Sequence, residues 1–122
     1  MLELASKRDK LSVVFDQIGS PTNAADLAKL ILTTLPKIKN ESVEIYHYSN
    51  EGICSWYEFA LEIFRIKQIQ IEINPIETVQ LKTVINRPSY SVFDKSKIKS
   101  HLGVIIPLWK DSLCYELEKI TT

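Results

Sequence analysis

Glycine is scarce in this sequence, and its spacing excludes two common kinds of nucleotide site. The only glycines are Gly19, Gly52 and Gly103. A dinucleotide-binding turn needs three glycines within six residues, so that the backbone can approach a pyrophosphate at the start of a helix. A Walker-type phosphate loop also needs closely spaced glycines. These 122 residues therefore build neither nucleotide cradle by themselves.

An excess of positive charge and long apolar runs are also lacking. The 15 Lys and Arg balance the 15 Asp and Glu, so the formal net charge is zero. A protein that binds nucleic acid normally carries a basic excess that neutralises phosphates, so we expect no nucleic-acid partner. No apolar run approaches the ~18 residues needed to cross a bilayer, and the opening residues do not resemble a signal peptide. We therefore expect no membrane partner.

Cysteine is the third scarce residue. Cys54 and Cys114 are the only two, which is neither a disulfide framework nor a metal cluster and fits a reducing cytoplasm. Hydrophobic residues make up 45% and charged residues 25%, as in an ordinary globular domain. Because an average domain has about 150 residues, we expect residues 1–122 to form one domain in the cytoplasm.

Strand and helix patterns alternate in the first half of the chain. Residues 11–15 form a short apolar run with two valines, which predicts a strand. A helix is expected over 23–35, capped by Asn23, with leucine and isoleucine recurring every four residues on one face. Residues 44–49 then predict a second strand. This order is typical of an α/β protein.

The middle of the chain has the strongest helix signal. Ser55 and Glu58 form a capping box, and an apolar stripe follows from Trp56 to Phe64. Residues 69–74 alternate isoleucine with polar residues and end before a proline, which predicts a half-buried strand. We therefore expect a helix over the stripe and a third strand after it.

The last third reads as one extended piece and two helices. A residue before proline avoids the helical region, so residues 87–93 are expected to be extended. Asp94 caps a short helix that ends at Gly103, and Pro107 lies near the first turn of a last helix with an apolar face over 109–120. Residues 76–86 remain ambiguous.

The resulting fold class is α/β, a small three-layer-like fragment with about three short strands and four helices. Parallel strands joined by helices need helices on both faces of their sheet, and three strands with four helices can only just provide them. A domain of this size buries only about 60–70% of its unfolded surface. We therefore expect this piece to depend on contacts with something larger.

No residue of the sequence is assigned a catalytic or metal-binding role. His47 and His101 are far apart and neither lies beside a cysteine, so no metal site is expected. Cys54 precedes a helix, but no histidine is close to it in sequence, and a small buried residue is favoured. Tyr115 and Lys119 match the Tyr-x-x-x-Lys pair of short-chain dehydrogenases, but without a cofactor turn they are interpreted as helix-surface residues.

Three loops at the ends of elements remain as candidates for a binding site. They cover residues 16–22, 49–52 and 87–90. Ligands of open α/β sheets gather at the carboxyl ends of strands, where the first two loops are expected. Arg87 can hold a diphosphate through two parallel hydrogen bonds. A simple turn, a helix cap and a solvated arginine remain the alternatives for these loops.

The order of these motifs closely resembles the C-terminal part of the dTDP-4-dehydrorhamnose reductase family, which consists of extended short-chain dehydrogenases. The similarity covers essentially all 122 residues in unbroken order. The matching stretches are residues 13–22, 25–28, 46–52, 54–60, 87–94, 96–97 and 102–103. In this family the glycine-rich NADPH turn and the catalytic tyrosine and lysine lie in the first half of a protein more than twice as long.

The resemblance implies that the chain is the substrate-binding part of such an enzyme. The full enzyme would use NADPH to reduce the C4 ketone of dTDP-4-dehydro-L-rhamnose to dTDP-L-rhamnose. The isolated chain is expected to bind no cofactor and no metal and to be inactive until the missing N-terminal half is present. The implied substrate-binding residues are Arg87, Gln17, Ser20, Thr22, Asn50, Glu51 and Tyr90, with Trp56 as a weaker candidate.

Two other roles remain open. The chain could be a non-catalytic module that binds a nucleotide sugar or a protein. It could also be a truncated product without a function of its own, from an internal start or an expressed fragment. An exposed sheet edge in such a fragment would favour pairing with the missing half or with a second copy.

Overall fold

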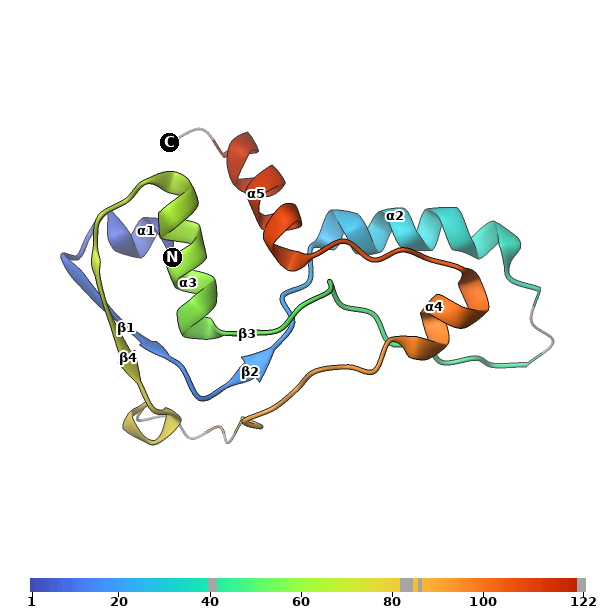
Figure 1. Cartoon of the computed structure of the whole chain (residues 1–122), viewed down its shortest axis with the longest axis horizontal. Coiled ribbons are helices and arrows are strands. Elements are labelled where there is room, and N and C mark those ends of the chain that lie inside the picture. Colours follow the sequence, from blue (N-terminus) through green and yellow to red (C-terminus); the bar gives the residue numbers. More distant parts are fainter. Residues whose placement is uncertain (40–41, 82–84, 86, 121–122) are drawn as a thin grey trace.

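The structure is a computed structural model that describes residues 1–39, 42–81, 85 and 87–120. In chain order the elements are α1 (Leu2–Ala5), β1 (Lys10–Val14), β2 (Ile18–Gly19), α2 (Ala24–Thr34), η1 (Leu35–Lys37), β3 (Cys54–Ser55), α3 (Trp56–Lys67), β4 (Glu72–Ile76), η2 (Thr78–Gln80), α4 (Ser96–Leu102) and α5 (Trp109–Lys119). The molecule is elongated, with β1, β4 and α3 at one end, α2 and α4 at the other, and α5 between them (Figure 1). The mixed α/β prediction is confirmed.

The main core lies at the strand end of the molecule. β1 and β4 pair in parallel, from Lys10 opposite Glu72 to Val14 opposite Ile76. Alternate residues of β1 point inward, because successive side chains of a strand face opposite sides. They pack against α3 and α5 in a cluster of buried residues: Leu11, Val13, Ala60, Ile63, Phe64 and Leu117. The parallel pair is therefore covered on one face by helices.

Helix α3 has the caps that the sequence predicts. The Ser55 hydroxyl accepts a hydrogen bond from the Glu58 backbone N–H at 3.1 Å, and the Glu58 carboxylate accepts one from the Ser55 N–H at 2.7 Å. The capping box is thus complete at both partners. The helix ends at Gln68, which adopts the left-handed conformation with φ 54°. Ala60, Ile63 and Phe64 of the predicted stripe are buried.

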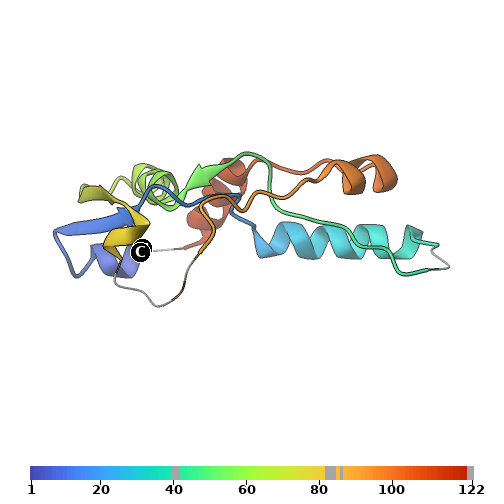
Figure 2. The same ribbon diagram turned by 90° about the horizontal axis from the view of Figure 1, so that it is seen from below.

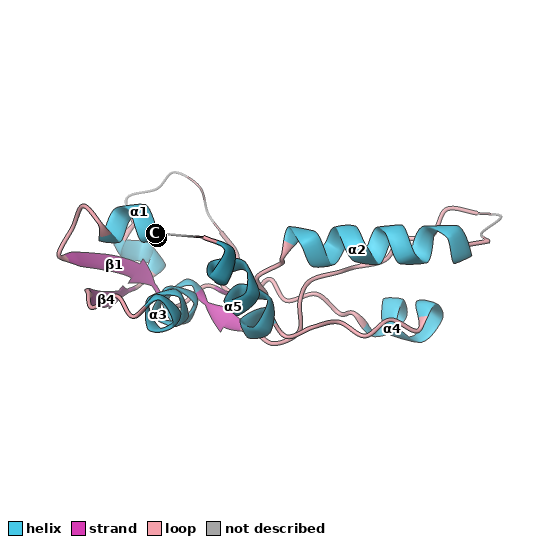
Figure 3. Cartoon of the chain, turned by 90° about the horizontal axis from the view of Figure 1, so that it is seen from above, coloured by secondary structure: helices cyan, strands magenta, loops and turns pink. Residues whose placement is uncertain are grey.

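The other end of the molecule, which we call the arm, consists of α2, η1, residues 43–48 and α4. Asn23 caps α2 as predicted, since its side chain accepts from the Asp26 N–H at 3.0 Å. The predicted apolar face of α2 is not covered, however, because Ile31 and Leu35 remain 48% and 63% exposed. Thr34 is the only buried residue of α2. Figures 2 and 3 show α2 and α4 in separate layers of the arm.

The predicted strand over residues 44–49 is wrong. These residues belong to no strand, and within the described part of the chain no backbone hydrogen bond pairs residues 43–48 with a neighbour. The residue types favour a strand, but a strand needs a partner edge, and the described residues supply none here. Two very short strands appear instead, β2 and β3, which pair antiparallel at Ile18 and Ser55 and at Gly19 and Cys54.

Other boundaries differ from the sequence prediction by a few residues. The third strand begins at Glu72 and includes Pro75, which is tolerated because β4 is an edge strand. The Asp94 carboxylate accepts from the Ser96 N–H at 2.8 Å, and α4 begins at Ser96, one residue later than a cap at Asp94 predicts. Gly103 ends α4 in the left-handed conformation, as predicted. Helix α5 begins two residues after Pro107, and Ile120 lies beyond its end.

The ambiguous segment is only partly described. Residues 78–80 form η2, whereas residues 82–84 and 86 lie outside the described residues. Within the described ranges, no helix has the length and apolar character needed to cross a membrane.

Candidate functional site

Asn50 lies at the point where four segments of the chain meet. Its side chain is fully buried. Its Oδ1 accepts from the Asn23 backbone N–H at 2.8 Å, and its Nδ2 donates to the Asp26 carboxylate at 2.7 Å and to the Ser112 hydroxyl at 2.9 Å. The Pro107 carbonyl lies 3.3 Å from the same Nδ2. One side chain thus joins the start of α2 to the start of α5.

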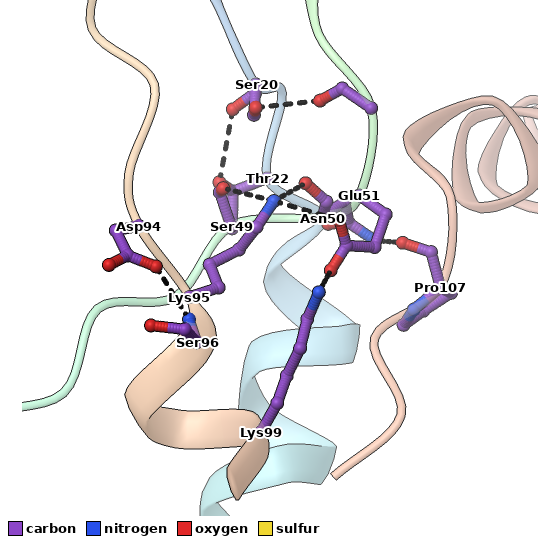
Figure 4. Close-up of polar contacts among 11 residues, drawn as sticks. Ser20, Thr22, Ser49, Asn50, Glu51, Asp94, Lys95, Ser96, Lys99 and Pro107 are labelled. Atoms are coloured by element: carbon purple, nitrogen blue, oxygen red, sulfur yellow. Dashed lines mark hydrogen bonds and ion pairs between the residues drawn. The ribbon is translucent and has the colours of Figure 1, made fainter.

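A buried lysine ties α4 to the same loop (Figure 4). Lys95 Nζ donates to the Asn50 carbonyl at 2.9 Å and lies 3.4 Å from the Glu51 carboxylate. Lys99 contacts the other Glu51 oxygen at 2.5 Å. The hydrogen bond from Lys99 is the main cause that lowers the pKa of Glu51, and the Lys95 charge adds to it. The carboxylate is therefore held ionised between two ammonium groups.

The loop after β1 is fixed against this junction. Ser20 donates its hydroxyl to the Gly52 carbonyl at 2.7 Å, and Thr22 lies next to it (Figure 4). Gly52 has φ 84°, and a Cβ at this position would lie 2.9 Å from Trp109 Cδ1. Only glycine fits both the backbone angle and the space. The turn whose carbonyl accepts from Ser20 therefore requires glycine at position 52.

A cavity of about 540 Å³ opens beside this loop. It lies between the loop after β1, the start of α3 and the segment that begins at Arg87. Its polar lining includes Gln17, Ser20, Thr22, Ser55 and Arg87, and its apolar lining includes Trp56, Phe59, Pro88 and Phe93. A concave site of this size, with apolar walls and a few polar groups, is typical of a pocket for a small organic ligand.

Two backbone hydrogen bonds bring the Arg87 segment to the loop after β1. The Ile18 N–H donates to the Ser89 carbonyl at 2.8 Å, and the Ser91 N–H donates to the Ile18 carbonyl at 2.9 Å. Arg87 is exposed at the cavity, and within the described part of the chain no ion pair or hydrogen bond joins its guanidinium to another residue. An unpaired guanidinium beside a pocket is suited to an anionic ligand.

The sequence-predicted site residues fall into two groups. Gln17, Ser20, Thr22 and Arg87 line the cavity. Gln17 is itself buried, and its amide Nε2 donates to the Thr78 hydroxyl at 3.0 Å. The remaining predicted residues, Asn50, Glu51 and Tyr90, do not line it.

The residues outside the cavity have contacts of their own. Asn50 and Glu51 belong to the junction behind the loop, while Tyr90 is 61% exposed and pairs through its backbone with Ile18. The structure therefore brings Asn50 and Glu51 together as supports for the cavity loop.

Sequence reasoning found the aromatic lining of this site only in part, since it names Trp56 as a weaker candidate and gives Phe59 and Phe93 no role in the site. Trp56 is 49% exposed and meets the Phe59 ring at 6.4 Å between centroids. The sequence places both on the core stripe of α3, but that stripe is wider than the core, so its first turn faces the cavity instead. Phe93 gives no signal in the sequence beyond its place after Arg87. Its ring contacts the His47 ring in a tilted arrangement, with centroids 5.1 Å apart.

The residues that sequence reasoning set aside have surroundings of their own in the structure. Burial raises the pKa of the Cys54 thiol to about 11, so it is protonated at neutral pH and a poor nucleophile. Lys119 Nζ lies 3.8 Å from the centroid of the exposed Tyr115 ring at the end of α5, and neither residue lines the cavity. The described residues contain no group of three His, Cys, Asp or Glu that could hold a metal.

A second hollow of about 850 Å³ lies between α1, α3 and β4. It is larger but more open to solvent, and Arg8 and Arg65 are among its lining residues. None of the predicted site residues borders it. The smaller cavity is therefore the better candidate site, because the loops that the sequence singles out converge there.

Several curated proteins are similar to this chain in sequence. The chain is 39% identical over 113 residues to the spore coat polysaccharide biosynthesis protein SpsK of Bacillus subtilis, covering 93% of this chain and 38% of that protein. It is 38% identical over 122 residues to the dTDP-4-dehydrorhamnose reductase of Aggregatibacter actinomycetemcomitans, covering 93% and 42%. The chain thus spans about two fifths of the length of these relatives.

Solved structures give the same result. A dTDP-4-dehydrorhamnose reductase from Bacillus anthracis in complex with NADP superposes with a TM-score of 0.88 at 33% identity, over 98% of this chain and 41% of that chain. The orthologue from Clostridium acetobutylicum superposes with a TM-score of 0.87 at 35% identity, over 98% and 42%. The family model of the RmlD substrate binding domain matches residues 1–122. The chain therefore belongs to the dTDP-4-dehydrorhamnose reductase family and corresponds to its substrate-binding domain.

Proposed function

We propose that this chain forms the sugar-nucleotide side of the active-site cleft of a dTDP-4-dehydrorhamnose reductase, as one domain over residues 1–122. The observation that carries the proposal is the cavity in which Gln17, Ser20, Thr22 and Arg87 meet. Two segments about 65 residues apart in sequence supply these groups, and backbone hydrogen bonds between Ile18 and the Arg87 segment hold them together. The pocket combines a cation, hydroxyl groups and apolar walls.

Each part of the pocket suits one part of a nucleotide sugar. Arg87 would pair with the diphosphate, because a guanidinium forms two parallel hydrogen bonds to phosphate oxygens. The faces of Trp56 and Phe59 would pack against the base or the sugar ring. The Ser20 and Thr22 hydroxyls and the Gln17 amide would accept from or donate to sugar hydroxyls. This division predicts affinity for the diphosphate-linked sugar.

The hydride-transfer chemistry of the proposed enzyme comes from outside these residues. NADPH would supply the hydride for the C4 ketone. The three glycines of this chain lie in β2, in the turn before β3 and at the end of α4, and none starts a helix that could cradle the pyrophosphate. The residues present therefore do not fit the cofactor, and they supply no group for the reduction step. The isolated chain is proposed to be inactive.

The partner in this proposal is the part of the reductase that the chain does not match. It corresponds to about three fifths of the relatives' length. Such a part would carry the cofactor turn and close the cleft over the sugar. We place this biosynthetic enzyme in the cytoplasm.

Titration calorimetry with dTDP-L-rhamnose tests the proposal on the isolated chain. We expect binding by the wild-type protein and an affinity about tenfold or more weaker for Arg87→Ala, because a charge-assisted hydrogen bond contributes about 1.5–3 kcal/mol. Arg65→Ala is the matched control, since Arg65 is an exposed arginine of α3 that pairs with Glu62 and lies outside the cavity. It should bind like the wild type.

Two outcomes would contradict the binding proposal. Absence of binding by the wild-type chain would favour a protein-interaction role or a product without its own function. Equal loss of affinity in Arg87→Ala and Arg65→Ala would place the ligand elsewhere. Separately, NADPH oxidation by the isolated chain would overturn the expectation that it is inactive.

A further inference from the structure

Strands β1 and β4 end side by side, and the chain after β1 enters the cavity lining at Gln17. The Phe15 N–H donates to the Ile76 carbonyl at 3.1 Å, which extends the contact between the strands beyond their last pair. Asp16 and Thr78 are as far apart in sequence as each pair of the parallel ladder, so they continue its register. Ligands of open α/β sheets gather at the carboxyl ends of strands. These two residues therefore lie where a binding site is expected.

The Asp16 carboxylate holds the start of η2. It accepts from the Thr78 backbone N–H, which lies 3.0 Å from both oxygens, and from the Thr78 hydroxyl at 2.7 Å. The hydrogen bond from the hydroxyl is the main cause that lowers the pKa of Asp16, and the bond from the backbone adds to it. The carboxylate is therefore ionised at neutral pH and can only accept. The single hydroxyl proton of Thr78 is thus committed to Asp16.

The direction of this bond decides the orientation of the Gln17 amide. A threonine hydroxyl has one proton to donate, so the Thr78 oxygen can only accept from any further partner. Gln17 Nε2 does donate to it, at 3.0 Å. The Gln17 side chain is buried, and an amide turned the other way would lose this bond and place two acceptors against each other. The amide oxygen Oε1 remains, and among the described residues no hydrogen bond reaches it.

We propose that Thr78 is a positioning residue that fixes Gln17 as a hydrogen-bond acceptor in the cavity, so that the pocket selects a ligand with an N–H or O–H donor at this point. This inference rests on the proposed function, which supplies the nucleotide sugar. Such a ligand has two kinds of donor, the imide N–H of thymine and the sugar hydroxyls. Its diphosphate carries acceptors only, so the Gln17 oxygen disfavours it and the Arg87 guanidinium, also in the lining, attracts it.

Calorimetric titration of variants with dTDP-L-rhamnose tests the positioning. Thr78→Val keeps the shape and the backbone N–H but removes the hydroxyl that orients Gln17. We expect an affinity about threefold to tenfold weaker, as for the loss of one neutral hydrogen bond. Thr78→Ser restores the hydroxyl and should restore the affinity. Gln17→Met removes the acceptor, leaves the contacts between Asp16 and Thr78 in place, and should weaken binding as much as Thr78→Val.

Thr33→Val is the matched control, since the Thr33 hydroxyl donates to carbonyls of its own helix α2 and Thr33 does not line the cavity. It should bind like the wild type. Circular dichroism and urea unfolding verify that each variant is folded. Wild-type affinity in Thr78→Val, or an equal loss of affinity in Thr78→Val and Thr78→Ser, would overturn the proposal.

Titration with dTDP, which lacks the sugar, distinguishes the two donors. If Thr78→Val weakens the binding of dTDP-L-rhamnose but not of dTDP, the donor is a sugar hydroxyl. If it weakens both, the donor is the thymine N–H, and the N3-methyl derivative of dTDP should then bind equally to the wild type and to Thr78→Val. A loss of affinity for the methylated ligand as well would overturn the proposal, because the variant would then disturb the whole pocket.

Nuclear magnetic resonance gives a readout that a merely structural role of Thr78 would not move. The side-chain carbonyl carbon of Gln17, assigned by its absence in Gln17→Met, should shift downfield when dTDP-L-rhamnose binds, because its oxygen then accepts a hydrogen bond. An unchanged shift would overturn the assignment of Gln17 as the acceptor.

The free chain tests the positioning without any ligand. We expect the Gln17 Nε2 protons to exchange with solvent at least about tenfold faster in Thr78→Val than in the wild type, because they lose their acceptor. Equal exchange in the two proteins would overturn the positioning whether or not the chain binds a ligand. A wild-type chain that binds no dTDP-L-rhamnose would instead overturn the proposed function, while faster exchange in Thr78→Val would still support the positioning.

Discussion

At the scale of single residues, Asn50 shows why an amide is required at the junction. The Asn23 backbone N–H can only donate, so it fixes the position of the Asn50 oxygen. The Asp26 carboxylate can only accept, so it fixes the position of the nitrogen. An aspartate at position 50 would satisfy the first contact and oppose the second with a like charge. Asparagine is therefore the one residue of this shape that satisfies both.

This complementarity predicts a specific rescue. Asn50→Asp should lower the free energy of unfolding by about 3 kcal/mol or more, because it leaves a buried carboxylate facing Asp26. Combining Asn50→Asp with Asp26→Asn should restore much of the loss, since the amide introduced at position 26 can donate to the carboxylate introduced at position 50. Urea unfolding of the wild type, both single variants and the double variant measures the coupling.

Asn74→Asp is the control, because among the described residues the Asn74 amide donates only to Glu72, two residues earlier on the exposed side of β4. It should change the free energy of unfolding by no more than about 0.5 kcal/mol. A double variant no more stable than Asn50→Asp alone would show that the two side chains are not coupled.

The role of Asn50 could not be derived from the sequence. Its position after an expected strand, in a loop with Glu51, predicts a ligand contact. Its actual partners lie 24 to 62 residues away, in α2 and α5. Local patterns do not encode such distances. Arg87, by contrast, does border the cavity, because the X-Pro sequence keeps its segment extended and able to pair with the loop after β1.

At the scale of elements, predictability follows how local the interactions are. Helix α3 is predicted to its N-terminal cap because Ser55, Glu58 and the apolar stripe lie within one segment. The sequence does not predict β2 and β3, because a strand of two residues is too short to show a periodic pattern. Tertiary contacts determine their pairing. The expected strand over 44–49 fails for the opposite reason. Its pattern is clear, but its hydrogen-bonding partner is not among the described residues.

The capping box of α3 provides a test at this scale. Ser55→Ala removes the hydroxyl that accepts from the Glu58 N–H, and an N-cap of this kind contributes about 1 kcal/mol. We expect the free energy of unfolding to fall by about that amount in thermal or urea unfolding. Ser55→Thr should recover most of it, because threonine also caps helices.

Ser100→Ala is the matched control in α4, where the hydroxyl donates to the Lys97 carbonyl of its own helix and to no other group of the described residues. It should change stability by no more than about 0.5 kcal/mol. An equal loss of unfolding free energy in Ser55→Ala and Ser100→Ala would mean that the N-cap contributes no more to stability than an ordinary serine hydroxyl of a helix.

At the scale of the whole molecule, stability is distributed unevenly between its two ends. The buried cluster of apolar residues lies entirely in β1, α3 and α5. In the arm, α2 buries only Thr34 and α4 buries only Ile98. Regions with few buried apolar contacts open locally at a lower free energy than the core. The arm of the isolated chain should therefore open without unfolding the rest.

Hydrogen exchange of the isolated chain, read separately for α2 and α3, tests this division. We expect the α2 amides to exchange faster than the α3 amides, since α2 depends on its cap and the Asn50 junction rather than on a core. Ile63→Val removes one buried methylene from α3 and should lower the global stability by about 0.5–1.5 kcal/mol. It should accelerate exchange in α3 and leave α2 unchanged, because local opening of the arm does not expose Ile63. Equal exchange rates in the two helices, both accelerated by Ile63→Val, would instead mean that arm and core unfold as one cooperative unit.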